Sequence, residues 1–354
     1  MKALVLSGGK GTRLRPFTYS MAKQLVPVAN KPVLIHCLEN IRDIGVREVG
    51  VVVGDHAEEI GSVVGDGSGL GLRITYIRQA EPLGLAHCVS VAADFLGDDD
   101  FVMYLGDNVF AEGIEASAAT FAARRPDAQV TVVKVPDARQ YGVAEVDRDG
   151  VVRALVEKPR EPRSDLAVTG VYFFTPAIHE AVRSIRPSAR GELEITDALQ
   201  FLVERGRTVI AQEHTGFWKD TGSIDELLEC NRVLLERLSG DIRGTVDGES
   251  TVRGTVVIEP GAVVTRSHLV GPLVIGAGSH VGDSRIGPGT ALGRDCVVQD
   301  ADIEESIVLE GAHVTGVPRL RGSIIGRWTD VRAAGRTEAN HLIIGDHTRA
   351  WVAA

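Results

Sequence analysis

The stretch MKALVLSGGKGTRLRPFTYSMAKQLVPV, residues 1–28, decides how this chain is organised. An apolar run, Ala3 to Leu6, predicts a buried strand that leads without a spacer into the glycine-rich sequence Ser7 to Arg13. Glycines tolerate positive φ and let backbone N–H groups approach a phosphate closely, and two cations, Arg13 and Lys23, lie in the same stretch. A strand, a glycine turn and two cations predict a polyphosphate-binding site.

Two familiar phosphate-binding loops do not fit this stretch. The P-loop requires G-x-x-x-x-G-K-[ST], and no glycine here is followed by Lys-Ser or Lys-Thr at that spacing. The dinucleotide fingerprint G-x-G-x-x-G would need a glycine where Leu14 stands. The glycines alone, Gly8, Gly9 and Gly11, also suit a turn that only reverses the chain, and it is the two cations that favour a phosphate site.

The length and composition predict a globular protein of two domains. A chain of 354 residues exceeds what one hydrophobic core usually fills, and 44% hydrophobic with 24% charged residues is typical of globular proteins. The net charge of −10 argues against nucleic acid and anionic membranes as partners. Since no apolar run is long enough for a membrane span and no signal-peptide pattern is present, we expect a cytoplasmic protein. The cysteines lack C-x-x-C pairs and are expected to be buried apolar residues.

Residues 1–240 are expected to form a doubly wound α/β domain. Short apolar strands at 3–6, 49–53, 72–77 and 101–105 alternate with helical patterns, which favours parallel strands. Pro32 is expected to open a helix that Gly45 ends, and Asp149-Gly150 between two alternating runs predicts a hairpin.

The composition and the hydrophobic period change after residue 240. Residues 241–250 are rich in Gly, Asp and Ser and are expected to be a linker. Beyond it, in residues 251–354, aliphatic residues recur every six positions with occasional fives, a pattern typical of a hexapeptide β-helix, and the repeat weakens after Ala312. The recurring residues are Ile258, Val264, Val270, Ile275, Val281, Ile286, Leu292 and Val298.

Several segments together resemble the sugar-1-phosphate nucleotidylyltransferases, and most of all the long form of the glucose-1-phosphate thymidylyltransferases. They are GGKGTRLRPFT (8–18), AKQLVPVANKPV (22–33), PLGLA (82–86) and RGELEITD (190–197). The resemblance covers nearly the whole chain. It implies a Rossmann-like doubly wound mixed sheet followed by a left-handed β-helix, and a reaction of dTTP with glucose 1-phosphate that needs Mg²⁺.

Two aspartates are candidates for the metal site that the resemblance implies. Asp107 in LGDN and Asp220 in KDTG each follow an apolar or aromatic run and precede a small or polar residue, which places them at strand ends. In isolation, either could be a solvated turn residue. Mg²⁺ takes few carboxylates together with water and substrate phosphate, so two aspartates suffice chemically.

The resemblance also implies which residues bind the nucleotide and neutralise its triphosphate. Arg13 and Lys23 would neutralise the triphosphate, and the amide of Gln79 can offer a donor and an acceptor to a pyrimidine edge. The nucleotide-binding candidates are Leu6, Gly8, Gly9, Gly11, Thr12, Arg13, Gln24, Gln79, Pro82, Gly84 and Asp107.

A third set of residues is assigned to the sugar phosphate by the same resemblance. Lys158 would hold its phosphate and Glu157 would hydrogen-bond the sugar, although Glu157-Lys158-Pro159 alone is typical of a surface. Tyr172 is equally well explained as a core aromatic residue. The candidates are Asn108, Gly142, Glu157, Lys158, Gly170, Tyr172 and Glu192, and the catalytic residues are expected to be Arg13, Lys23 and Lys158.

The sequence therefore predicts thymidylyl transfer from dTTP to glucose 1-phosphate by in-line attack at the α-phosphorus. The alternatives are a uridylyl- or guanylyltransferase, a regulatory or assembly subunit, and an acyltransferase that uses the β-helix. We expect the β-helix to serve oligomerisation or regulation and the chain to form a homo-oligomer.

Overall fold

The computed structural model describes residues 1–9, 11–335 and 342–353. The chain forms two compact units. The first contains Met1–Gly9 and Leu34–Asp220, and the second contains Lys10–Val33 and Thr221–Ala354. The chain thus leaves the first unit after Gly9, returns to it at Leu34 and leaves it again after Asp220. No helix in the described ranges is long and apolar enough to cross a membrane.

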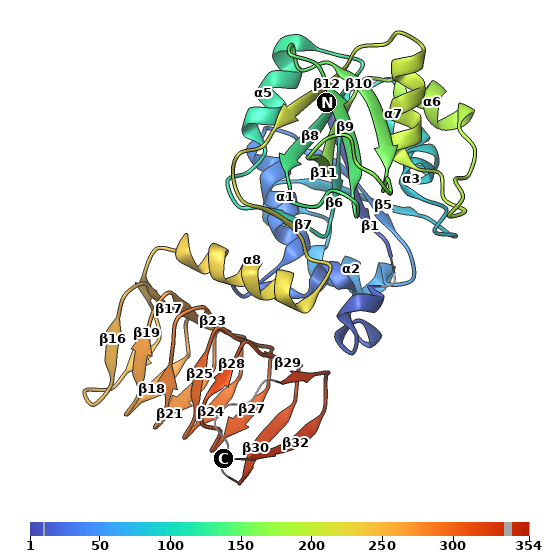
Figure 1. The fold of residues 1–354 in the computed structure, drawn as a ribbon. Coiled ribbons are helices and arrows are strands. Elements are labelled where there is room, and N and C mark those ends of the chain that lie inside the picture. The colour runs from blue at the N-terminus through green and yellow to red at the C-terminus, as the bar shows by residue number, and fades with distance from the viewer. Residues whose placement is uncertain (10, 336–341, 354) are drawn as a thin grey trace. The chain divides into compact units, whose positions relative to one another are not determined.

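The first unit is built on a mixed β-sheet, which confirms the predicted fold class (Figure 1). Its strands are β1 (Lys2–Ser7), β4 (Glu48–Val53), β5 (Arg73–Arg78), β6 (Phe101–Leu105), β8 (Ala128–Lys134), β9 (Gly142–Val146), β10 (Val152–Glu157), β11 (Leu166–Phe174) and β12 (Val209–Glu213). The hydrogen-bonded path runs β10-β9-β11-β6-β1-β4-β5, and β8 joins β11 to β12. β1 pairs in parallel with β4 and β6, whereas β11 runs antiparallel to β6.

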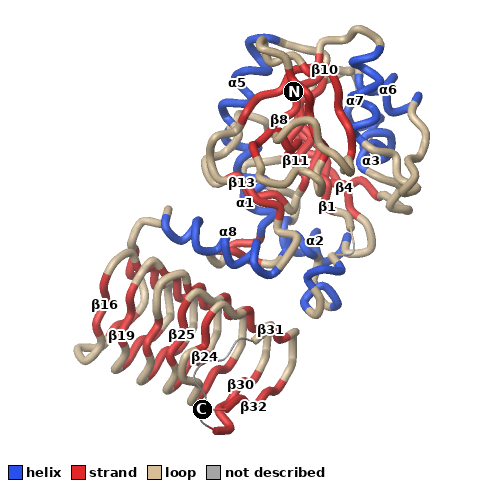
Figure 2. Tube along the Cα trace, in the orientation of Figure 1, coloured by secondary structure: helices blue, strands red, loops and turns tan. Residues whose placement is uncertain are grey.

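Helices lie on both faces of this sheet, as a doubly wound fold requires (Figure 2). They are α1 (Val33–Asp43), α2 (Ala57–Val64), α3 (Leu85–Val91), α4 (Ala93–Leu96), α5 (Glu115–Arg124), α6 (Ile178–Ser184) and α7 (Ile195–Glu204). α1 ends just before Gly45, whose φ of +84° favours glycine, so the predicted stop is confirmed. The predicted hairpin around Asp149-Gly150 is formed by β9 and β10.

Apolar side chains from the sheet, α3, α6 and α7 pack into one core cluster. Tyr104, Phe101 and Phe174 are fully buried in the unit. All four cysteines of the chain are buried and free, as expected. Burial raises the pKa of Cys88 and of Cys296 to about 12, which suits packing residues rather than nucleophiles.

The second unit contains a β-helix of three parallel sheets, consistent with the predicted left-handed form. One sheet comprises β14 (Asp241–Ile242), β17 (Val256–Ile258), β20 (Leu273–Ile275), β23 (Thr290–Leu292), β26 (Ile307–Val308), β29 (Ile324–Ile325) and β31 (Ile343–Ile344). The next comprises β15 (Thr245–Val246), β18 (Val263–Thr265), β21 (His280–Gly282), β24 (Val297–Gln299), β27 (His313–Thr315), β30 (Asp330–Gly335) and β32 (Arg349–Ala353). The shortest comprises β16 (Thr251–Arg253), β19 (His268–Val270), β22 (Arg285–Ile286), β25 (Asp302–Glu304) and β28 (Leu320–Arg321).

The coil of this β-helix refines the predicted repeat. Successive coils are linked by hydrogen bonds between residues 17 apart, which explains why spacings of five interrupt the spacings of six. Within β19, Leu269 is fully buried and Val270 only partly buried, so the predicted recurring position there was wrong by one residue. The apolar core also continues past Ala312 as far as Val331, because the later coils keep the period while their flanking residues change.

The stretch predicted to be a linker contains two strands of the β-helix. β14 pairs with β17, and β15 pairs with β18. The turns of a β-helix coil have the same Gly, Asp and Ser composition as a linker, so composition does not separate the two.

One helix and one irregular segment complete the second unit. α8 (Ile224–Glu236) is capped by Ser223, whose hydroxyl accepts a hydrogen bond from the backbone N–H of Glu226. Leu235 of α8 packs against Val274 and Ala291 of the β-helix. Residues 11–33 form three 3-10 turns and the hairpin of β2 (Pro27–Val28) and β3 (Lys31–Pro32).

Candidate active site

The predicted site residues are divided between the two units. The first unit holds the strand ends and the sugar-side candidates, and the second holds Gly11, Thr12, Arg13, Lys23 and Gln24. Each set has its own geometry.

The carboxyl end of β1 lies beside the predicted base-reading residue. A Cβ added at Gly8 would lie 3.6 Å from the Oε1 atom of Gln79. Gly9 has φ of +100°, a conformation that favours glycine. Leu6, a predicted nucleotide contact, is 6% exposed and belongs to the core cluster.

The amide of Gln79 is oriented by its neighbours. Its Nε2 atom lies 3.0 Å from Nδ1 of His87 and donates to the carbonyl of Gly84 at 3.4 Å. This arrangement leaves Oε1 on the side of Gly8 as the acceptor that a pyrimidine N–H could use.

Two segments distant in sequence meet at Gly84. A Cβ there would lie 2.5 Å from the carbonyl oxygen of Leu193, and φ is +109°, so only glycine fits. Backbone hydrogen bonds join Leu193 N to Leu83 O at 2.7 Å and Ala86 N to Leu193 O at 3.0 Å. The PLGLA and RGELEITD segments therefore lie side by side, with Pro82 exposed at the start of the first.

The two predicted metal ligands lie close together along one small ladder. β7 (Asn108–Phe110) and β13 (Trp218–Asp220) pair antiparallel, and Asp220 stands opposite Asn108, the residue after Asp107. Two carboxylates at neighbouring positions are a donor set that suits Mg²⁺, which completes its shell with water and phosphate oxygens. In the described part of the chain no cluster of three or more His, Cys, Asp or Glu side chains offers a metal site.

Asn108 connects this ladder to the sugar-side candidates. Its Nδ2 donates to Oδ1 of Asp107 at 2.8 Å, and its Oδ1 accepts from Nε1 of Trp218 at 2.7 Å. The ring of Trp218 meets Tyr141 edge-on at 5.6 Å. A Cβ at Gly170 would lie 2.6 to 2.9 Å from three atoms of the Asn108 amide, so glycine leaves room for it.

Gly170→Ala should therefore displace Asn108 and disturb Asp107. Displacement of a positioning group by about 1 Å can lower the rate about a hundredfold, so we expect kcat/KM for glucose 1-phosphate to fall by about tenfold to a hundredfold. The control is Gly69→Ala, whose added Cβ meets nothing within 4 Å. Equal kcat/KM values for Gly170→Ala and Gly69→Ala would show that the position of Asn108 does not affect the reaction.

Glu157 ends β10 beside Gly142, and Lys158 follows it. Gly142 pairs with Glu157 across the hairpin, and its Cβ would lie 3.2 Å from Oε2 of Glu157. Thr196 donates to the same Oε2 at 3.2 Å, while Lys158 Nζ lies 4.0 Å from Oε1. Lys158 has φ of +43° and its side chain is 42% exposed, so the ammonium is accessible to a ligand.

Arg190 links three carboxylates around this position. It contacts Glu157 at 3.4 Å, Glu192 at 3.1 Å and Glu194 at 3.6 Å. Burial raises the pKa of Glu157, the charge of Glu194 adds to the effect, and Lys158, Thr196 and Arg190 only partly oppose it. The protein therefore holds a carboxylate in a place that disfavours its charge.

Glu157→Gln should raise stability and lower activity. Because the folded-state pKa is raised, the unfolded chain loses its proton first, and the wild type loses stability as the pH rises from the ordinary Glu pKa through the raised value. We expect a higher Tm for the variant at pH 7 and no difference near pH 3, together with a higher KM for glucose 1-phosphate. A lower Tm at pH 7 would contradict this interpretation.

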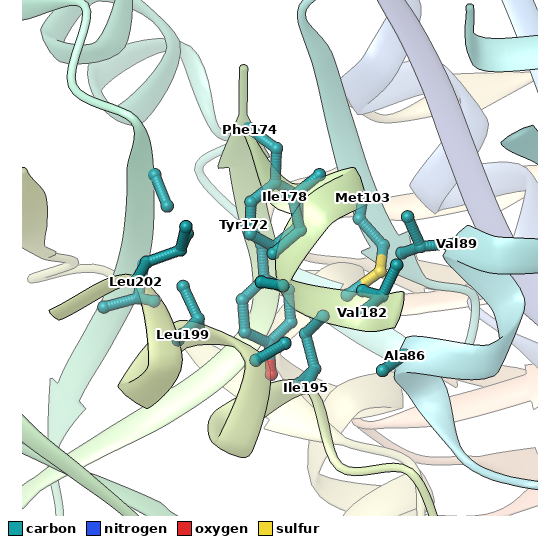
Figure 3. Packing of buried hydrophobic residues seen from close by; sticks show 14 of the residues in the cluster. Ala86, Val89, Met103, Tyr172, Phe174, Ile178, Val182, Ile195, Leu199 and Leu202 are labelled. Atoms are coloured by element: carbon teal, nitrogen blue, oxygen red, sulfur yellow. The ribbon is translucent and has the colours of Figure 1, made fainter. Parts of the chain in front are cut away.

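The remaining sugar-side candidates differ in their surroundings. Tyr172 is 4% exposed and packs in the apolar core with Phe174, Leu199 and Ile195 (Figure 3), which supports the packing interpretation. Burial raises its pKa, with the charge of Glu157 adding to the effect. The side chain of Glu192 is 41% exposed and bound to Arg190.

In the second unit the two cations lie in separate 3-10 turns, Thr12–Leu14 and Lys23–Leu25, of one folded segment. A Cβ at Gly11 would lie 2.8 Å from Thr18 and 3.2 Å from Cβ of Lys23, and Thr18 Oγ1 donates to Gly11 O at 2.7 Å. Thr12 and Arg13 are exposed and lie in the first 3-10 turn, whereas Gln24 is 2% exposed. A Cβ at Gly222 would lie 2.9 Å from the Arg13 guanidinium, so this glycine leaves room for it.

Several residues of this geometry were not identified from the sequence, among them Arg190, Glu194 and His87. Arg190 and Glu194 are part of RGELEITD, but nothing in that string shows that they surround Glu157. His87 lies on a helix pattern that gives no sign of its contact with Gln79, because this contact depends on the path of the chain between β5 and α3.

Comparisons with known proteins agree with these features. The Nucleotidyl transferase family matches residues 2–237. The glucose-1-phosphate thymidylyltransferases of Streptomyces griseus and Streptomyces antibioticus are 54% and 53% identical; the first match covers 100% of both chains and the second 99%. A crystal structure of a Bacillus anthracis protein in complex with sucrose superposes with a TM-score of 0.63 at 32% identity, covering 68% of this chain and 98% of that one.

Proposed function

The chain belongs to the nucleotidyl transferase family, and we propose that it transfers the thymidylyl group of dTTP to glucose 1-phosphate, releasing pyrophosphate. The observation that carries this proposal is the identity of 53–54% along the full length of two glucose-1-phosphate thymidylyltransferases. All proposed site residues fall within residues 1–240, which we propose as the catalytic domain, followed by the β-helix, whose first strand β14 begins at Asp241.

The proposed reaction needs no general base. A phosphate oxygen of glucose 1-phosphate is already an anion, and it forms a bond to the α-phosphorus while the bond from that phosphorus to the bridging oxygen breaks. The electron pair leaves with pyrophosphate. The site has to supply alignment and charge neutralisation, which accounts for its Gly, Arg, Lys and Asp residues.

The three cationic side chains have different roles in the proposed reaction. Arg13 and Lys23 neutralise the triphosphate and the charge that develops at the α-phosphorus, and Lys158 positions the attacking phosphate. Glu157 and Glu192 orient the sugar together with Asn108.

Asp107 and Asp220 would hold Mg²⁺. The chemistry that this ion supplies when bound is neutralisation of phosphate charge and a better leaving group. The paired strand ends and the carboxylate chemistry of the two residues support this assignment.

A matrix of nucleoside triphosphates against sugar 1-phosphates, scored by pyrophosphate release, tests the proposal. Thymine differs from uracil by one methyl group, so we expect kcat/KM for dTTP to exceed that for UTP by about 10- to 200-fold. Preference for GTP or ATP would contradict the thymidylyl assignment. No pyrophosphate release with any pair would instead favour a regulatory or assembly subunit.

Location and assembly remain predictions. A cytoplasmic location is predicted from the globular composition. A homo-oligomer is expected, and sedimentation of the full chain would show it.

A further inference from the structure

The segment that carries Arg13 and Lys23 belongs to the same compact unit as the β-helix. Residues 11–33 contain only short 3-10 turns and one two-residue hairpin. Such a segment has few backbone hydrogen bonds of its own, so its conformation depends on what it packs against. Polar contacts join the segment to the β-helix at Ser20 and at the tip of the β2–β3 hairpin.

The first contact joins Ser20 to the last described coil of the β-helix. Ser20 Oγ donates to Oδ2 of Asp346 at 2.8 Å, and the Nη2 atom of Arg327 donates to the carbonyl of Ser20 at 3.0 Å. Arg327 also binds Asp346 through its backbone N, Nε and Nη2, at 2.7 to 2.8 Å. The side chain of Asp346 is 3% exposed, so this ion pair is shielded from solvent.

Close packing accompanies this contact. A Cβ at Gly345 would lie 3.2 Å from Cβ and Cγ of Pro16, so the glycine lets the coil approach the segment. Pro16 is three residues from Arg13.

The second contact holds the tip of the β2–β3 hairpin. Ala29 and Asn30 both have positive φ, 48° and 61°, and alanine is disfavoured there. The tip is supported from outside, because Ala29 N donates to Oδ1 of Asn231 at 2.8 Å and Asn30 Nδ2 donates to Leu292 O at 2.6 Å. Asn231 is fully buried, and its Nδ2 donates to Gly289 O of the β-helix at 2.8 Å.

We propose that the β-helix positions residues 11–33 for catalysis through these two contacts. Asp346, Arg327 and Asn231 are positioning residues, which act through the segment and do not touch substrate. Lys23 lies between the two attachment points, and Arg13 precedes the first. The inference rests on the proposed function, because only an enzyme that uses these two cations gains from holding them.

A loosely held cation is costly in this kind of reaction. Displacement of a positioning group by about 1 Å can lower the rate about a hundredfold, because alignment provides much of the catalysis. The proposal thus gives the β-helix a part in turnover besides oligomerisation.

Two variants of the full chain test each contact. Asp346→Ala removes the carboxylate that Ser20 and Arg327 share. Asn30→Gly removes the amide that reaches Leu292 but still allows positive φ, and it leaves every β-helix residue in place. The control is Asp283→Ala. It breaks an ion pair between neighbouring coils, in which Asp283 Oδ2 lies 2.6 Å from Arg266 Nη2, and this pair does not involve residues 11–33.

Hydrogen exchange and kinetics together decide the outcome. We expect amides in residues 11–33 to exchange about tenfold faster in both test variants than in the wild type, and to be unchanged in the control. We also expect kcat to fall about tenfold while KM for glucose 1-phosphate stays the same. A higher concentration of glucose 1-phosphate should restore neither the wild-type exchange rate nor the wild-type kcat.

The results distinguish an error in this proposal from an error in the proposed function. Unchanged exchange in Asn30→Gly and Asp346→Ala would overturn the proposal, and so would faster exchange with an unchanged kcat. If Asp346→Ala lowers the Tm of the β-helix, the exchange rates and kcat of Asn30→Gly still test the proposal. If the wild type transfers no nucleotidyl group, the proposed function fails, whereas the exchange result still shows whether the β-helix holds the segment.

Discussion

Replacing Arg13 with alanine is expected to lower kcat about a thousandfold, because a cation placed at a phosphoryl transition state contributes about that much to the rate. Arg13 is exposed in a 3-10 turn and makes no core contact that its loss would remove, so the Tm should stay within a few degrees of the wild type. Steady-state kinetics with saturating dTTP and glucose 1-phosphate measures the effect.

Arg15→Ala provides the matched control. It removes the same charge from the same turn region, and the Arg15 guanidinium lies over the ring of Tyr19 at 4.9 Å. A kcat loss as large as that of Arg13→Ala would show that net charge, not position, matters. A folded Arg13→Ala protein with normal turnover would remove Arg13 from the mechanism.

Asp107→Asn is expected to lower kcat/KM at least a hundredfold at low Mg²⁺ and to shift the Mg²⁺ dependence to higher concentration. Removing one of two carboxylates halves the negative charge of the donor set and weakens its attraction for a divalent cation. Asp107 lies beside Asp220 along the β7–β13 ladder, so Asp220→Asn should shift the dependence in the same direction. Activity is measured as a function of added Mg²⁺.

The control for this effect is Asp94→Asn, which removes an exposed carboxylate from α4 of the same unit. We expect its Mg²⁺ dependence to match that of the wild type. If Asp107→Asn responds to Mg²⁺ exactly as the control does, the two aspartates do not hold the metal.

Much of the fold could be predicted because its signals are local. The apolar strands, the stop at Gly45 and the Asp149-Gly150 hairpin each depend on a few neighbouring residues. The hexapeptide period gave the β-helix, but not whether Leu269 or Val270 points inward, since both are apolar and one register step separates them.

The arrangement of the site was harder to predict from the sequence than the fold. Asp107 and Asp220 could be placed at strand ends, but their shared ladder depends on pairing between segments more than a hundred residues apart. Arg190 could not be linked to Glu157 either, because the two residues are 33 positions apart and no local pattern joins them. The sequence also contains no local sign that Ser20 meets Asp346, because that contact depends on how many coils the β-helix completes.

The most direct test of the central claim is the fate of the α-phosphate of dTTP. The wild-type chain is incubated with Mg²⁺, glucose 1-phosphate and dTTP labelled with ³²P at the α-position, and the products are separated. The proposed reaction places the label in dTDP-glucose and releases one pyrophosphate for each molecule formed. Label that stays in dTTP, or that appears only in dTMP or dTDP, would contradict the account.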